Sequence, residues 1–220
     1  TIADEYVRLY DIEKPVVVLN CPVLRSKEIV KQDLFRAQFA IPASARIFLY
    51  QGYLYPGRGI DVMLEAFNRL NLANGALVFM GEGGLADTIR RHARHGKSVF
   101  LHPFVSGDVL LNYTSSADCG LCFIEDISLS DRYCLPNKLF EYIAAGLPVI
   151  SSGLPDLTRF ITTHKVAAAA PSNDVEGFIH AFKNLPDLDS PELQQNISRT
   201  RASFNWGTQE KILFNLYDSL

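Results

Sequence analysis

Residues 136–150, Pro-Asn-Lys-Leu-Phe-Glu-Tyr-Ile-Ala-Ala-Gly-Leu-Pro-Val-Ile, predict a short helix followed by a buried strand. Pro136 suits the first helical turn, where its missing N–H would have no partner, and Gly146 suits the left-handed residue that ends many helices. A helix that begins at a sheet edge presents free N–H groups and the positive end of its dipole, which favours phosphate. Glu141 lies about one turn further along, on the face of Asn137, where it can hold hydroxyl groups. The stretch therefore predicts a nucleotide site.

Short apolar runs alternate with helix-length amphipathic segments through most of the chain. The predicted strands are residues 16–19, 47–51, 76–80, 99–101, 119–124, 149–151 and 166–170. The predicted helices between them are residues 60–71, 85–95, 108–116, 137–145 and 157–163. This alternation predicts an α/β fold with a Rossmann-like, doubly wound parallel sheet, whose ligand lies at the carboxyl ends of the strands. Further helices are predicted at residues 27–39, 192–203 and 208–219, with a possible helix near the amino terminus.

Composition excludes several classes of protein. The 220 residues are 48% hydrophobic and 20% charged, which is ordinary for a globular domain, and the net charge of −3 gives no general attraction to nucleic acid. No apolar run approaches the roughly 18 residues of a membrane span. The chain begins without Met and without the features of a signal peptide, so we expect a piece of a longer protein.

The four cysteines, Cys21, Cys119, Cys122 and Cys134, are expected to be core residues in a reducing compartment. Cys119 and Cys122 have the spacing of a metal pair, but side chains three apart in a strand point to opposite faces. No second pair completes a zinc site. We therefore expect no metal and a cytoplasmic protein.

Two glycine-containing loops that follow predicted strands can bind a ligand. Gly52, Tyr53 and Arg58 lie in residues 51–60, where small residues allow close approach to phosphate and the guanidinium supplies a fork of donors. The same loop is also explained by a glycine-rich turn with a surface arginine. Glu82, in the next such loop, can contact sugar hydroxyls or simply occupy a turn.

Three other regions have a functional and a structural interpretation. Phe104 and Val105 can form one wall of a base pocket, whereas the preceding His102 is expected to be structural. The acidic residues of 125–134 suggest either a metal or a solvated loop. The basic residues of 90–97 either complement a helix dipole or contact anionic lipid or another chain.

Taken in this order, the motifs resemble the donor-binding C-terminal half of GT-B glycosyltransferases, specifically the large retaining family 4. The resemblance is carried by residues 51–67, 78–83, 137–150 and 204–220. It implies transfer of a sugar from a nucleotide-diphosphate sugar to an acceptor in glycan or polysaccharide biosynthesis, with no cofactor and no metal. Residues 25–220 would form the nucleotide-sugar-binding domain, and residues 1–24 a remnant of a first domain and the interdomain segment.

The missing first domain would carry the glycan or lipid-linked acceptor, so the fragment should be inactive alone. The full-length protein would be cytoplasmic or peripheral at the inner face of the membrane. Arg58 and Glu141 would be catalytic in the sense of stabilising the donor, with Lys138 assisting. The donor-binding residues implied are Gly52, Tyr53, Arg58, Glu82, Phe104, Val105, Tyr133, Asn137, Lys138, Leu139 and Glu141.

The sequence departs from the family pattern at two positions. Tyr53 stands where the family usually has an arginine, although Arg58 keeps the second cation. Tyr133 stands where the family has its sugar-binding glutamate, although Glu141 keeps the ribose-binding one. Tyr133 itself, or an acid of the loop at 125–131, is the candidate replacement. A sugar-nucleotide 2-epimerase and a non-catalytic interaction module remain alternative functions.

Overall fold

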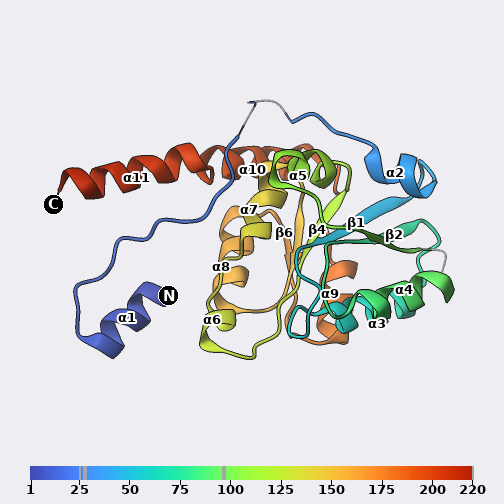
Figure 1. The fold of residues 1–220 in the computed structure, drawn as a ribbon, viewed down its shortest axis with the longest axis horizontal. Coiled ribbons are helices and arrows are strands. Elements are labelled where there is room, and N and C mark those ends of the chain that lie inside the picture. Colours follow the sequence, from blue (N-terminus) through green and yellow to red (C-terminus); the bar gives the residue numbers. More distant parts are fainter. Residues whose placement is uncertain (25, 27–28, 96–97, 220) are drawn as a thin grey trace.

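The computed structural model describes residues 1–24, 26, 29–95 and 98–219, and its centre is a parallel sheet (Figure 1). Within this part of the chain the sheet has six strands in the order β3-β2-β1-β4-β5-β6. The strands are β1 (Arg46–Gln51), β2 (Gly75–Met80), β3 (Val99–His102), β4 (Cys119–Cys122), β5 (Val149–Ser151) and β6 (Ala167–Ala169). From β1 the chain adds β2 and then β3 on one side of the sheet, and it then returns to add β4, β5 and β6 on the other side of β1. The predicted α/β, doubly wound fold is confirmed.

Helices cover both faces of the sheet (Figure 1). One face carries α2 (Leu34–Phe39), α5 (Gly107–Thr114), α7 (Asn137–Ala144), α8 (Pro155–His164) and α10 (Pro191–Ser203). The other carries α3 (Ile60–Leu70), α4 (Ala86–His95) and α9 (Val175–Lys183). Side chains of β1 alternate between the two cores, with Ile47 and Leu49 in the first and Phe48 and Tyr50 in the second.

The two ends of the described chain lie outside the sheet and its helices. The segment after α1 (Ile2–Tyr10) runs without regular structure, and α11 (Trp206–Asp218) extends away from the sheet (Figure 1). They are joined where the Leu19 N–H donates to Gln209 Oε1 at 2.9 Å and the Trp206 N–H donates to the Pro22 carbonyl at 3.0 Å. Among the described residues, no helix has both the length and the apolar character needed to cross a membrane.

The predicted strand at 16–19 is wrong. These residues have no regular structure, and Val16 and Val17 are about half exposed. An apolar run becomes a strand only where a neighbouring strand accepts its backbone hydrogen bonds, and here a glutamine side chain satisfies the N–H of Leu19 instead.

One predicted helix needs correction, and two helices of the structure were not predicted. Of the helix predicted at 27–39, Lys27 and Glu28 lie outside the described residues, and the helix begins only at Leu34, whose N–H donates to Ser116 Oγ at 3.2 Å. A predicted loop contains the short helix α6 (Leu129–Arg132), capped by Ser128. The helix α9 had no predicted counterpart, although Asp174 caps it by accepting from the Gly177 N–H.

Asp118 joins α2 to the beginning of β1. Its carboxylate accepts from the Ile47 N–H at 2.8 Å, Arg36 Nη2 at 2.9 Å and Lys31 Nζ at 2.9 Å. Burial alone would raise the pKa of Asp118, but these three donors outweigh burial and lower it.

Asp118→Asn is therefore expected to lower the free energy of unfolding by about 2 kcal/mol at pH 7. Because the folded pKa lies below the unfolded one, the contribution is present above the unfolded pKa and is lost as pH falls through the folded pKa. Urea denaturation between pH 7 and pH 3.5 measures this, and the difference between wild type and variant should shrink towards the acidic end. A difference that stays constant with pH would contradict the assignment.

Candidate functional site

A cavity of about 490 Å³ lies at the carboxyl ends of β1, β2 and β4, beside the amino terminus of α7. This is the point where the strand order reverses between β1 and β4, which is where open parallel sheets bind ligands. The cavity is lined by Tyr50, Gln51, Gly52, Tyr53, Arg58, Met80, Phe104, Val105, Leu110, Ile124, Pro136, Asn137, Lys138 and Glu141.

The amino terminus of α7 directs backbone donors towards this cavity. Pro136 precedes the helix in an extended conformation, and no side chain caps the first turn. The Leu139 N–H already donates to the Pro136 carbonyl at 3.0 Å. Among the hydrogen bonds of the described residues, none uses the N–H groups of Asn137 or Lys138. These two donors and the helix dipole make a site for an anion.

Lys138 is half-buried, and its ammonium lies 3.7 Å from the centre of the Tyr50 ring. Burial, with a smaller contribution from the nearby Arg58 cation, lowers the pKa of Lys138 to about 8 against the opposing effect of Glu141. An ammonium beside the face of a tyrosine ring is stabilised by the ring quadrupole. A bound anion would stabilise the protonated ammonium of Lys138, which burial disfavours.

Glu141 is held in place by a chain of hydrogen bonds. Gln51 Nε2 donates to Glu141 Oε2 at 2.5 Å, and Thr114 Oγ1 donates to Gln51 Oε1 at 2.8 Å. Burial raises the pKa of Glu141, while Gln51 and Lys138 act in the opposite direction. Gln51 is itself buried and uses both ends of its amide. It therefore fixes the position of the Glu141 carboxylate at the cavity wall.

Tyr142 anchors α7 to the sheet. Its hydroxyl accepts from the Gln51 N–H at 3.0 Å and donates to the Leu121 carbonyl at 3.2 Å. The ring lies directly against Gly120, where an added Cβ would be 2.3 Å from Tyr142 Cγ. Only glycine leaves room for this close approach of helix and strand.

Arg58 forms an ion pair with Asp131 of α6, with 3.4 Å between Nη1 and Oδ1. Its loop is fixed by Glu125, whose Oε1 accepts from the Gly59 N–H at 3.2 Å and whose N–H donates to the Gly57 carbonyl at 3.1 Å. Gly57 and Gly59 both have positive φ, which the turn requires. The arginine is 42% exposed, so it can exchange its carboxylate partner for a ligand anion.

The family model for glycosyl transferases group 1 matches residues 45–187, which is most of the chain. This chain belongs to that family.

The relatives and solved structures of this glycosyltransferase chain agree with that result. It is 21% identical over 150 residues to "Probable glycosyltransferase WbjE" of Pseudomonas aeruginosa, covering 67% of this chain and 38% of WbjE. WaaG, a glycosyltransferase involved in lipopolysaccharide biosynthesis, has a TM-score of 0.67 at 17% identity, covering 94% of this chain and 58% of WaaG. HepE from Anabaena, solved with UDP and glucose, has a TM-score of 0.67 at 13% identity, with coverage of 94% and 58%.

The chain therefore spans less than two thirds of each of these proteins. At these identities, the structural matches establish the fold, which is that of one half of a GT-B glycosyltransferase. The expected family and Rossmann-like fold are confirmed.

Eight of the predicted donor-binding residues line the cavity of this glycosyltransferase domain: Gly52, Tyr53, Arg58, Phe104, Val105, Asn137, Lys138 and Glu141. The other three lie elsewhere. Glu82 is exposed beside a different groove, Tyr133 ends α6 outside the cavity lining, and Leu139 is fully buried in the core.

Gln51 and Thr114, which hold Glu141, were not predicted from the sequence. Gln51 is the polar last residue of an apolar strand, and a polar side chain at the carboxyl end of a central strand is the signal that could have found it. Thr114 ends α5 and is fully buried, and nothing in its local sequence distinguishes it from a helix-terminal threonine.

Cys119, Cys122 and His102, which the sequence analysis also considered, are buried within the fold and do not line the cavity. Cys119 and Cys122 are buried in the two opposite cores, as expected, and burial raises the pKa of each to about 12. His102 is buried, and its ring lies 4.6 Å from that of Tyr113. In the described ranges, no three His, Cys, Asp or Glu side chains cluster in a way that could hold a metal ion.

Proposed function

We propose that this chain binds the nucleotide-diphosphate sugar in a GT-B glycosyltransferase of the retaining family 4. The observation that carries the proposal is the cavity at the tip of α7, where two cations and a carboxylate come together. The structure of HepE in complex with UDP and glucose supports a nucleotide-sugar ligand for this fold. In the full-length protein the sugar would pass to a glycan or lipid-linked acceptor held by another domain, so this chain alone should not transfer sugar.

Each group of the cavity has a role in this proposal. Arg58, Lys138 and the free N–H groups of α7 would neutralise the charge that develops on the leaving diphosphate. Glu141, fixed by Gln51, would accept hydrogen bonds from the ribose hydroxyls. Phe104, Val105 and Met80 would form the apolar wall for the base. No step in this scheme requires a metal or cofactor, because the cations of the chain supply the positive charge.

The sugar itself needs a further contact, because Tyr133 does not line the cavity. No acidic residue of 125–131 lines the cavity either, but Asp131 reaches its wall through the ion pair with Arg58, which does line it. Glu125 accepts from the Gly59 N–H and Asp126 pairs with Arg132, away from the cavity lining. We therefore assign the sugar contact to Asp131 in this proposal. The full-length protein would work in the cytoplasm, free or at the inner face of the membrane.

Isothermal titration with UDP, GDP and ADP tests the proposal. We expect one of the three to bind, and Arg58→Ala to weaken that binding about tenfold because a charge-assisted contact to phosphate is lost. Arg69→Ala is the matched control, since Arg69 is also an exposed, ion-paired arginine but lies at the far end of α3. The proposal fails if no diphosphate binds, or if Arg58→Ala and Arg69→Ala bind with the affinity of the wild type.

A further inference from the structure

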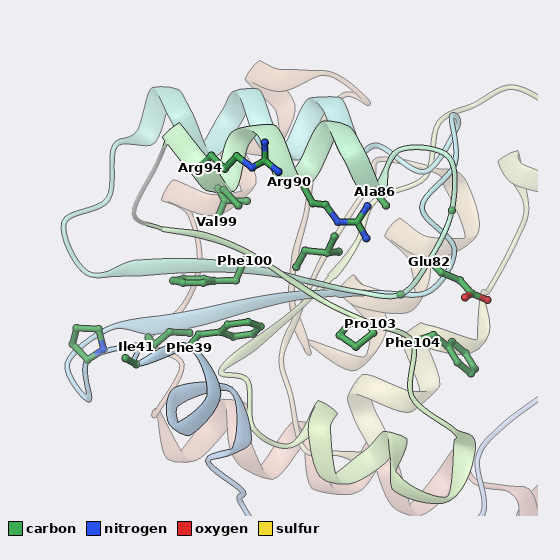
Figure 2. Close-up of a pocket in the computed structure, with 16 residues that line it drawn as sticks. Phe39, Ile41, Glu82, Ala86, Arg90, Arg94, Val99, Phe100, Pro103 and Phe104 are labelled. Carbon is green, nitrogen blue, oxygen red and sulfur yellow. The ribbon is translucent and has the colours of Figure 1, made fainter.

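A second and larger hollow, which we call the edge groove, runs along the outer edge of β3 between α4 and α2. It has a volume of about 1130 Å³. Figure 2 shows Arg90 and Arg94 on the α4 side, Phe39 and Ile41 on the α2 side, and Phe100 of the strand between them. The cavity at the tip of α7, which we call the donor cavity, does not include these residues.

The floor of the edge groove is an unpaired strand edge. The Ser98 carbonyl accepts from the Leu77 N–H at 2.7 Å, and the His102 carbonyl accepts from the Gly81 N–H at 3.0 Å. The even-numbered residues along β3 therefore direct their backbone groups towards β2. In a parallel ladder the intervening residues, Val99 and Leu101, direct their N–H and C=O groups to the other side. Among the described residues, no hydrogen bond involves these outward groups. They form a template for another strand.

The charge of the edge groove is positive. Arg90 and Arg94 are one helical turn apart on the same wall, whereas Glu82 is the acidic residue of the lining. Arg90 pairs with Asp87 of its own helix but remains 56% exposed. Because the chain as a whole has a net charge of −3, this positive wall is a local feature rather than part of a generally basic surface.

We propose that the edge groove binds an extended acidic segment of a partner protein, which adds a strand to β3. The partner backbone would pair with Val99 and Leu101, its apolar side chains would contact Phe39 and Phe100, and its carboxylates would meet Arg90 and Arg94. A lipid chain fits less well, because hydrocarbon cannot satisfy the outward N–H and C=O groups. A second copy fits less well, because it would place its own arginines against these two.

Selection from a displayed library of random ten-residue peptides tests this inference. We expect the selected peptides to alternate acidic and apolar residues. The best of them, labelled with fluorescein and measured by anisotropy, should bind at least fivefold more weakly to the R90Q/R94Q double variant. Arg199 is an exposed arginine on α10, and Arg199→Gln is the matched control. This variant should bind the peptide with the affinity of the wild type. Far-UV circular dichroism checks that both variants are folded.

A second measurement uses the wild-type protein alone, so it does not depend on the folding of a variant. The same peptide with methylated backbone nitrogens keeps its charge but cannot donate to a strand, and it should show no measurable binding. Equal binding by the methylated peptide or by R90Q/R94Q would overturn the inference. So would a dimer in sedimentation that dissociates in R90Q/R94Q, or recruitment by phosphatidylglycerol vesicles without binding of any selected peptide. None of these results depends on nucleotide binding at the donor cavity.

Discussion

Gly120→Ala is expected to lower the free energy of unfolding by about 3 kcal/mol, as severe overpacking of a core does. The added methyl would lie 2.3 Å from Tyr142 Cγ and 2.4 Å from Cδ2. The ring cannot move aside without breaking the hydrogen bonds of its hydroxyl to the Gln51 N–H and the Leu121 carbonyl. Urea denaturation followed by far-UV circular dichroism measures the loss.

Two further variants isolate the cause. Gly107→Ala is the matched control, because nothing lies within 4 Å of a Cβ at that position, and its stability should be unchanged or slightly higher. In a Tyr142→Ala background the ring is absent, so Gly120→Ala should cost less than about 1 kcal/mol. If Gly120→Ala remains equally destabilising in that background, the contact with Tyr142 is not the reason.

The affinity for the nucleoside diphosphate that binds, whether UDP, GDP or ADP, is expected to fall about 20-fold between pH 7.5 and pH 9.5. Burial and Arg58 lower the pKa of Lys138 to about 8 in the free protein, so the ammonium loses its proton within this range. A diphosphate beside Lys138 favours the charged form, so binding is strongest below pH 8 and weakens as the pH rises above it. Titration calorimetry at half-unit steps measures the profile.

The variant Lys138→Met should bind more weakly at pH 7.5 and should lose the pH dependence. Lys183 is an exposed lysine at the end of α9, and Lys183→Met is the control. This variant should keep the pH dependence of wild-type binding. An unchanged profile in Lys138→Met would show that another group carries the titration, and would remove Lys138 from the proposed diphosphate contacts.

The sheet could be predicted from the sequence because most of its strands are short, mainly apolar runs with clear ends. β1 and β2 are examples, since both are buried along nearly their whole length between two layers of helices. The same rule failed at Val16, where the run is equally apolar but no strand of the sheet lies beside it. Apolar character identifies a candidate strand, and only a partner makes it one.

The site was predictable where local chemistry was sufficient. Gly52, Arg58 and Asn137 follow from loop and helix-start patterns, and all three line the cavity. Glu82 follows from a similar pattern, but the path of its loop places it beside the edge groove. Such placement depends on how neighbouring loops pack. Gly81, for example, approaches the carbonyl of Gly52 so closely that a Cβ there would be 1.9 Å from the oxygen.

The hydrogen bonds of Gln51 join parts of the chain that are made at different times. Thr114 is 63 residues and Glu141 is 90 residues further along the sequence. Loops of this length close late, because the entropy cost of bringing their ends together must be met before the contacts form. During synthesis on a ribosome, the Gln51 side chain at the end of β1 therefore lacks its hydrogen-bond partner Glu141 until α7 has emerged. The wall that holds Glu141 is complete only after α7 has been synthesised and the central strands have paired.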